Sequence, residues 1–374
     1  MGYDALPKVD TRREMHEQLE LAISNIGEER DLEEDFEGVS KGKKYLKSLF
    51  IESNIPVERI RHQKNIEIIP TKDTTIKLLK ILKNNSISFS YLDTLDPRFW
   101  VLYSLDKGIE IKKEIADLIQ HNNSYLDYTW FSSSSLQELS KGYSKTNFSM
   151  RFSNYFQNKA LPMKRLTIRL WAEDASEIIE NLIKNEYIGK GACLSNIEIN
   201  YINELNQFIK TRLGMDGSVN ISKGNSLERL IEYQADLIQG HYKPLIETIE
   251  RDYRMEYQTG ENGINIKGNI ISIRFSQKLD NISEFCSNLL KGTNPFRFAG
   301  FASKIEDDDY LLNIIDLHNA RVFDMEVFPN EILVNLPKDA CGNSVIRLYA
   351  LCQERVDPRA KLQGGDGHVL LAAQ

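Results

Sequence analysis

Residues 310–336 read YLLNIIDLHNARVFDMEVFPNEILVNL. Within this stretch, the runs 310–318, 322–328 and 331–336 are rich in Ile, Leu, Val and Phe, and short polar segments separate them. Apolar residues that alternate with polar ones place one face of a strand in the core. The stretch therefore predicts three consecutive antiparallel strands with short turns, followed by a helix at 345–353.

Three units along the chain share the order strand, polar cap, short amphipathic helix and strand. They begin near residues 66, 166 and 270. Their helices are expected at 76–82, 178–183 and 285–290, each after a side-chain oxygen that can cap free N–H groups. We therefore expect an α+β fold with two or three tandem βαβ-containing modules, mainly antiparallel sheets and flanking helices. A chance likeness of common elements is the alternative.

Changes in composition suggest where the modules begin and end. The best breaks are near Pro162 and at a glycine-rich turn near Gly260, and a helix from Leu227, interrupted at Gly240 and Pro244, precedes that turn. The last residues change to Gly, Ala and Leu, which favours a tail outside the fold. The expected division is an acidic helical arm at 1–37, an N-terminal α+β domain at 38–162, a middle α+β domain with a long helix at 163–260, a C-terminal module of antiparallel sheet and helix at 261–356, and a tail at 357–374.

The composition is ordinary for a soluble globular protein, with 374 residues of which 41% are hydrophobic and 27% are charged. No apolar run of about 18 residues could span a membrane, and residues 1–20 lack the apolar core of a signal peptide. The cysteines at 193, 286, 341 and 352 form no CxxC pair, which argues against a zinc site of the usual spacing. We therefore expect a cytoplasmic protein with free thiols and no membrane partner.

The acidic charge is concentrated at the N-terminus. Residues 1–37 hold 12 acidic and 4 basic side chains, whereas the remaining residues hold 42 acidic and 43 basic ones. Leu19, Ile23 and Ile26 recur at helical spacing within this segment. It is either a solvated helix or arm, or an element that docks on a basic surface of this chain or of a protein partner.

Residues 139–172 contain seven Lys or Arg and no Asp or Glu, with aromatic residues interleaved. Cations neutralise phosphates and aromatic faces stack on unpaired bases, so this pattern favours contact with single-stranded nucleic acid or RNA. The candidate contact residues are Lys141, Tyr143, Lys145, Arg151, Tyr155, Lys164, Arg165 and Arg169. The alternative is an ordinary strand, because Phe148, Met150 and Phe152 alternate with polar residues and would then belong to the core.

A hairpin with a three-residue turn at 319–321 would place Asp316 opposite Asp324. Two carboxylates across a ladder repel each other, and a divalent cation would relieve the repulsion, as would Arg297 or Arg347. The candidate metal ligands are Asp316, His318, Asp324 and Glu326. A solvated hairpin face that needs no such partner is the alternative.

The sequence contains no convincing set of catalytic residues, which favours a binding protein over an enzyme. We expect a cytoplasmic, non-enzymatic binding or assembly protein that contacts single-stranded nucleic acid or RNA and holds no cofactor. One alternative is a metal-dependent phosphodiesterase or nuclease that uses the acidic hairpin. Another is a protein-binding subunit that docks through its acidic N-terminal helix.

Overall fold

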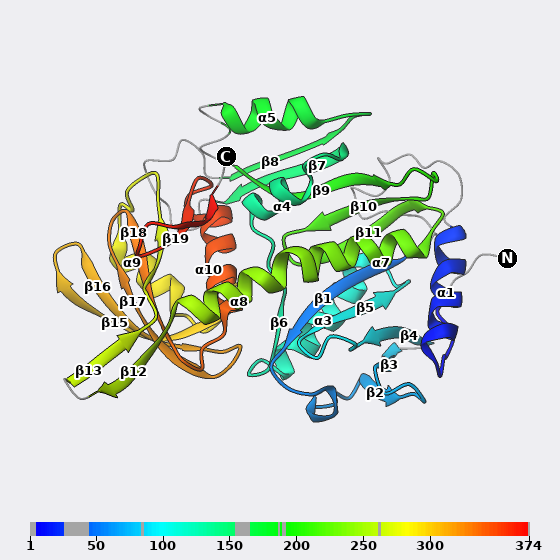
Figure 1. Cartoon of the computed structure of the whole chain (residues 1–374), viewed down its shortest axis with the longest axis horizontal. Coiled ribbons are helices and arrows are strands. Elements are labelled where there is room, and N and C mark those ends of the chain that lie inside the picture. The colour runs from blue at the N-terminus through cyan, green and yellow to red at the C-terminus, as the bar shows by residue number, and fades with distance from the viewer. Residues whose placement is uncertain are drawn as a thin grey trace.

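The computed structural model describes residues 5–25, 45–83, 86–153, 165–185, 188, 192–260 and 263–372. They form two mainly antiparallel sheets with helices packed against them (Figure 1), so the predicted α+β class is confirmed. Among the described residues, no helix is both long and apolar enough to cross a membrane.

The first sheet has eleven strands within the described residues. Their bounds are β1 (Lys47–Ser53), β2 (Ile66–Pro70), β3 (Ile76–Lys83), β4 (Ser86–Asp93), β5 (Phe99–Ser104), β6 (Leu126–Tyr128), β7 (Ser144–Ser153), β8 (Arg165–Trp171), β9 (Cys193–Ile202), β10 (Phe208–Gly214) and β11 (Ser218–Gly224). Their order is β2-β3-β4-β5-β1-β11-β10-β9-β7-β8, with β6 beside β1. The boundary expected near residue 162 therefore falls between β7 and β8, which are hydrogen-bonded neighbours in one sheet.

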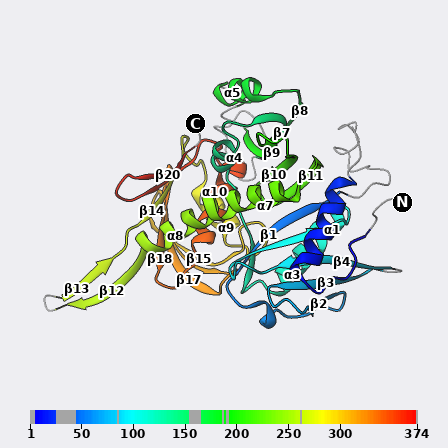
Figure 2. The same cartoon turned by 45° about the vertical axis from the view of Figure 1, so that its right-hand side comes forward.

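The second sheet has nine strands within the described residues. Their bounds are β12 (Arg254–Gly260), β13 (Gly263–Lys267), β14 (Ile271–Arg274), β15 (Phe298–Glu306), β16 (Asp309–Asp316), β17 (Arg321–Val327), β18 (Glu331–Pro337), β19 (Lys361–Gly364) and β20 (Val369–Ala372). The order is β15-β16-β17-β18-β14-β19-β20, and the β12–β13 hairpin projects from the body (Figure 2). The three consecutive strands predicted from residues 310–336 are present as β16, β17 and β18.

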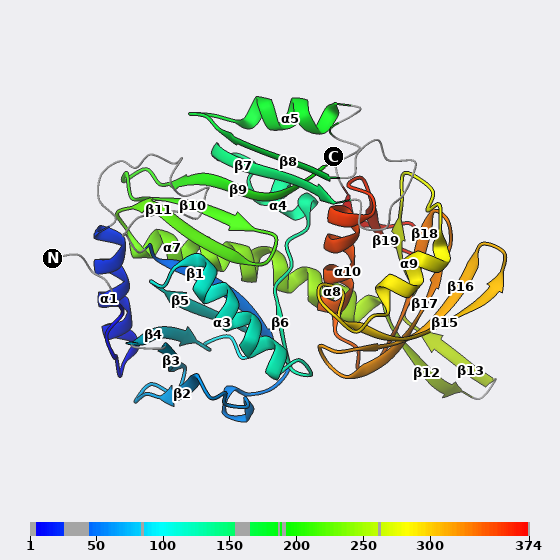
Figure 3. The same cartoon turned by 180° about the vertical axis from the view of Figure 1, so that it is seen from behind.

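The helices cover the sheets and join them. Their bounds are α1 (Arg12–Ser24), the 3-10 turn η1 (Val57–Arg59), α3 (Gly108–His121), α4 (Ser133–Leu139), α5 (Ser176–Lys184), α7 (Leu227–Ala235), the π-helical η2 (Asp236–Tyr242), α8 (Lys243–Asp252), α9 (Ile282–Leu289) and α10 (Gly342–Arg355). Helix α3 lies on β1 and β5 (Figure 3), where Ile111, Ile115 and Leu118 join a cluster with Leu49 and Ile51.

A long helix connects the two sheets (Figure 1). It runs from α7 through η2 into α8, where the sequence predicts an interruption at Gly240 and Pro244. The chain widens into a π-helical segment there and does not break. Because proline has no N–H to donate, it fits where the regular hydrogen-bond ladder is already disturbed. Ser226 caps the start of α7, since its side chain accepts a hydrogen bond from the N–H of Arg229.

The helix expected in the middle of the first unit is wrong. Residues 76–82 form the strand β3, which pairs with β2 and β4, and not a helix. A short run in which apolar residues dominate has no clear period, so its neighbours in the sheet decide its structure. In the other two units, the predicted helices at 178–183 and 285–290 are present within or overlapping α5 and α9.

The tail expected to lie outside the fold belongs to the second sheet. Strand β19 pairs with β14 and β20 pairs with β19. The side chain of Leu362 is fully buried, and the Tyr349 hydroxyl donates to the carbonyl oxygens of Ala360 and Leu371 at 3.1 and 3.4 Å. Pairing with the open edge of β14 gives this short segment its order.

The N-terminal helix α1 is packed on this chain's own core. Met15, Leu19, Ala22 and Ile23 are buried, and the helix contacts α7 and β11. Its apolar stripe is therefore already covered. The acidic run that follows, at 28–37, lies outside the described residues.

Candidate functional site

The apolar side chains of the basic stretch that lie on β7 belong to the core. Phe148, Met150 and Phe152 on β7 are buried, as the alternative interpretation expects. The ring of Tyr143 packs against the ring of Tyr201, with centroids 5.3 Å apart. Tyr155 and Lys164 lie outside the described residues.

The basic residues of the stretch separate into two groups along β7. Lys141 bonds Glu138 with Nζ 2.5 Å from Oε2, and Lys145 reaches the Ser176 hydroxyl at 3.4 Å. Arg151 lies at the other end of the strand, roughly 20 Å from Lys145 at about 3.3 Å per residue. The candidate nucleic-acid residues therefore do not form one surface.

Strands β8, β7, β9 and β10 instead share a face that is polar. The strand register places these residues on it: Arg165, Thr167, Arg169 and Trp171 of β8; Asn147, Ser149 and Arg151 of β7; Asn196, Glu198 and Asn200 of β9; and Lys210 and Arg212 of β10. We call this set the polar face. Because side chains alternate along a strand, the buried apolar residues of β7 lie on the opposite side of the sheet.

The charge of the polar face is strongly positive. Glu198, the one acidic residue in the set, is fully buried and is neutralised by Lys210 and Arg212, with N···O separations of 3.4 and 3.3 Å. Arg151 and Arg165 are exposed, and within the described chain neither has an acidic partner in an ion pair. Anions would therefore be attracted to this end of the sheet.

The three arginines Arg151, Arg165 and Arg169 line one pocket of about 370 Å³. Glu354 and Arg355, at the C-terminal end of α10, complete its wall. The pairing of β7 with β8 brings the three strand arginines together, since Arg151 lies opposite Thr167 and between Arg165 and Arg169. Three of the eight candidate nucleic-acid residues are thus brought together.

Several buried polar atoms of the polar face have no hydrogen-bond partner among the described residues. They are Oδ1 and Nδ2 of Asn147, Oγ of Ser149, Oδ1 of Asn196 and Oδ1 of Asn200. A buried polar atom without a partner costs about 1–3 kcal/mol, so such groups call for an explanation. A bound ligand or water would supply the missing hydrogen bonds.

The four candidate metal ligands of the hairpin do not form one site. Asp316 pairs with Arg321 and Asp324 pairs with Asn313, so the expected register is wrong. Asp316 is buried, whereas Asp324 and Glu326 lie between the buried positions of β17 and face the other side of the sheet. The turn is set by packing of Phe323 and Met325 in the core, which shifts the pairing.

Asp316 is held by Arg347, one of the two arginines that the sequence suggested. Arg347 Nη2 lies 2.5 Å from Asp316 Oδ1, and Nη1 bonds Asp127 of β6. Arg297 also bonds Asp127, at 2.9 Å. Burial alone would raise the pKa of Asp127, but the two guanidinium groups hold it well below its usual range. The four residues form a compensated ion cluster between the sheets.

The imidazole of His318 contacts Glu52 of β1, with Nε2 2.9 Å from Oε2, while the backbone N–H of His318 donates to Asp316 Oδ1 at 2.9 Å. Both side chains are fully buried. Burial would raise the pKa of Glu52, but Arg98 and His318 lower it to about 2. Burial would lower the pKa of His318, but Cys341 and Glu52 raise it well above its usual value.

A cavity of about 780 Å³ adjoins this group of buried side chains. Its wall includes Asn54, Arg98, Glu250, Asn319 and Cys341, which come from both sheets and from α8. Large clefts between structural units, lined by convergent polar groups, are the usual places for ligands. The molecule therefore offers two candidate sites, the polar face and this cavity between the sheets.

The comparison with known proteins extends over nearly the whole chain. Residues 4–371 match the MJECL33-like protein family. The chain belongs to that family. A relative from Methanocaldococcus jannaschii, Uncharacterized protein MJECL33, is 25% identical over 405 aligned residues, which cover 96% of this chain and 95% of the relative. The part that matches the MJECL33-like family contains both sheets, so both candidate sites lie within it.

Sequence reasoning missed Glu52, Asn147 and Cys341. Glu52 carries a local signal, because it is a single carboxylate at the end of the apolar run Leu49–Ile51. A charged residue buried in a strand is rare without a partner or a function. Cys341 carries no local signal beyond that of a free cysteine, because its partner Glu52 lies 289 residues away in the sequence.

Proposed function

We propose that this protein binds single-stranded nucleic acid on the polar face of β7–β10. The observation that carries the proposal is the convergence of Arg151, Arg165 and Arg169 around one pocket. Three guanidinium groups within one pocket can each donate to phosphate oxygens, and guanidinium geometry suits phosphate. The binding would be driven by neutralisation of the backbone.

The rest of the polar face supports a single strand over a duplex. The side chains of Asn196 and Asn200 on this face are partly exposed, and side-chain amides hydrogen-bond the edges of unpaired bases. Trp171 lies on the same face, two residues beyond Arg169, and an indole ring is a sequence-tolerant stacking partner. In a duplex the edges of the bases are already paired and their faces already stacked, so neither is available to these side chains.

A cytoplasmic location is part of the same proposal. All four cysteines are free and buried, which agrees with a reducing compartment. The docking role of the N-terminal segment stays a prediction.

The test is fluorescence anisotropy of the full chain with labelled single-stranded RNA, single-stranded DNA and duplex DNA, at about 50 and 200 mM salt. Three phosphate contacts to a single strand predict a log–log salt slope of about −2, which is roughly a 20-fold loss of affinity over this range. The double variant Arg151→Ala/Arg165→Ala should weaken binding and flatten the slope to about −0.7.

The matched control is Lys141→Ala. This residue belongs to the same basic stretch, but it pairs with Glu138 and lies outside the pocket. It should bind like the unaltered chain. Binding that is equal in the double variant, or no binding to any strand, would refute the proposal.

A further inference from the structure

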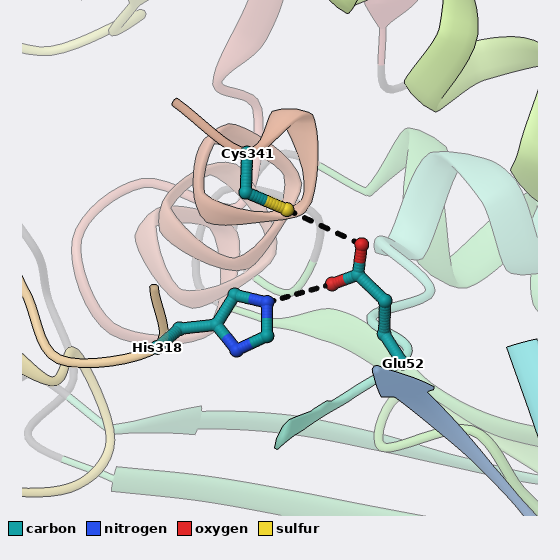
Figure 4. Close-up of side chains that lie close together, drawn as sticks. All are labelled: Glu52, His318 and Cys341. Atoms are coloured by element: carbon teal, nitrogen blue, oxygen red, sulfur yellow. Dashed lines mark hydrogen bonds and ion pairs between the residues drawn. The ribbon is translucent and has the colours of Figure 1, made fainter. Parts of the chain in front are cut away.

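Three side chains from distant parts of the chain point toward one another between the sheets (Figure 4). Glu52 lies on β1, His318 follows β16, and Cys341 is the N-cap residue of α10. One ligand atom from each, a carboxylate oxygen, an imidazole nitrogen and a sulfur, lies within 4.8 Å of the other two. We call these three residues the interior centre.

Two hydrogen bonds within the interior centre end on the Glu52 carboxylate. Cys341 Sγ lies 3.2 Å from Glu52 Oε1, and His318 Nε2 lies 2.9 Å from Glu52 Oε2. Two neighbours bond the centre from outside, since Asn54 Nδ2 lies 3.0 Å from His318 Nε2 and Arg98 Nη2 donates to Cys341 Sγ at 3.3 Å. The other ring nitrogen of His318, Nδ1, is buried and has no partner within the described part of the chain.

This geometry does not fit a cysteine nucleophile with a histidine base. In such a relay the thiol bonds one ring nitrogen and the orienting carboxylate bonds the other. Here the carboxylate occupies Nε2 and also bonds the thiol, which itself lies close enough to the imidazole to raise its pKa. Because Nδ1 has no partner among the described residues, the carboxylate does not orient the ring from the side opposite the thiol. Helix α10 begins at Cys341, but burial and the nearby Glu52 carboxylate raise the pKa of its thiol.

The same geometry fits a metal ion. A cation placed among the three donor atoms would replace the hydrogen bonds that now join them. The combination of thiolate, imidazole and carboxylate is one that zinc accepts, whereas magnesium and calcium prefer oxygen alone. Zinc with one thiolate and one carboxylate is formally neutral, which suits a buried position.

The surroundings resemble those of an open metal site. Cys341 lines the large cavity, and so do Arg98 and Asn54, which contact the other two members of the centre. Arg98 bonds Glu52 and also Glu250, so it holds the carboxylate in place from outside. Three protein ligands leave a fourth position for water or a substrate, and here a cavity adjoins it.

We propose that Glu52, His318 and Cys341 bind one zinc ion whose open position faces the cavity. This site is separate from the polar face and does not depend on nucleic-acid binding. The two are joined by α10, which has Cys341 at its start and Arg355 at its end, roughly 20 Å apart at about 1.5 Å per residue.

The test is zinc content measured by mass spectrometry after the full chain is incubated with zinc and dialysed. About one ion per chain is expected, because the donors form one group. Cys341→Ala and His318→Ala should each reduce the retained zinc to background. Cys286→Ala is the matched control, since it removes another buried cysteine, in α9, and should leave the zinc content unchanged.

Cobalt provides a second measurement that does not depend on the stability of the variants. Bound to the unaltered chain, it should give the near-ultraviolet charge-transfer absorption of a thiolate ligand, and added zinc should abolish this absorption. Circular dichroism of each variant reports whether it is folded. No retained zinc and no cobalt absorption in the unaltered chain would overturn the proposal, and so would full zinc retention in a folded Cys341→Ala variant.

Discussion

Arg347 of α10 and Asp316 of β16 form a fully buried ion pair, with Nη2 2.5 Å from Oδ1. The same guanidinium bonds Asp127 of β6, so one side chain connects the two sheets. Removing one partner of a buried pair leaves a charge without compensation. This contact is therefore a sensitive measure of how the sheets are held together.

Arg347→Leu should lower the free energy of unfolding by about 3–5 kcal/mol, because Asp316 and Asp127 would lose a shared cation. Urea unfolding followed by circular dichroism measures the loss. Arg13→Leu is the control, since Arg13 is 88% exposed and pairs with Glu17 on the surface. A loss as small as that of the control would show that the buried cluster does not hold the sheets together.

Truncation after Ala360 should destabilise the protein, because it removes β19 and β20. The loss of the buried Leu362 side chain alone should cost at least about 2 kcal/mol. Removal of residues 373–374 alone is the control and should have little effect. Equal melting temperatures for the two truncated chains would contradict the role of this segment in the second sheet.

Glu114→Gln should stabilise the protein near pH 8. Burial raises the pKa of Glu114 from 4.5 to about 7, and Asp106 adds to the rise while Lys83 opposes it. The folded form thus keeps a proton that the unfolded form has lost. The stability from this proton is fully present below about pH 4.5 and is lost as the pH rises through about 7, in total about 3 kcal/mol.

The measurement is the free energy of unfolding from pH 4 to 8 for both chains. The difference between Glu114→Gln and the unaltered chain should grow over this window. Asp308→Asn, at an exposed position, should run parallel to the unaltered chain. A constant difference across the window would mean that Glu114 keeps its ordinary pKa.

Asn147→Leu should separate stability from binding on the polar face. The amide of Asn147 is fully buried without a partner among the described residues, so an apolar side chain of similar shape should be neutral or stabilising. Because the buried amide is out of reach of a base, affinity for a single strand should stay unchanged. Unfolding curves and anisotropy measured together decide the matter. A loss of affinity with unchanged stability would contradict this expectation and show that Asn147 becomes accessible when a strand binds.

The sequence by itself determined most local structure. Alternating apolar and polar residues predicted β7 and the three strands β16–β18, and a capping side chain marked the start of α9. These patterns depend on neighbours at periods of two or about four residues, which sequence displays directly. The free thiols and the concentration of positive charge near β7 and β8 could be predicted for the same reason, because composition alone carries them.

Only the tertiary structure decided the sites. The contact between His318 and Glu52 spans 266 residues, and that between Cys341 and Glu52 spans 289. Strand order and register brought Arg151 between Arg165 and Arg169, and turned Asp324 away from Asp316. No local period encodes such contacts, because they arise when whole sheets pack to bury their apolar faces and each polar side chain then meets whatever lies opposite.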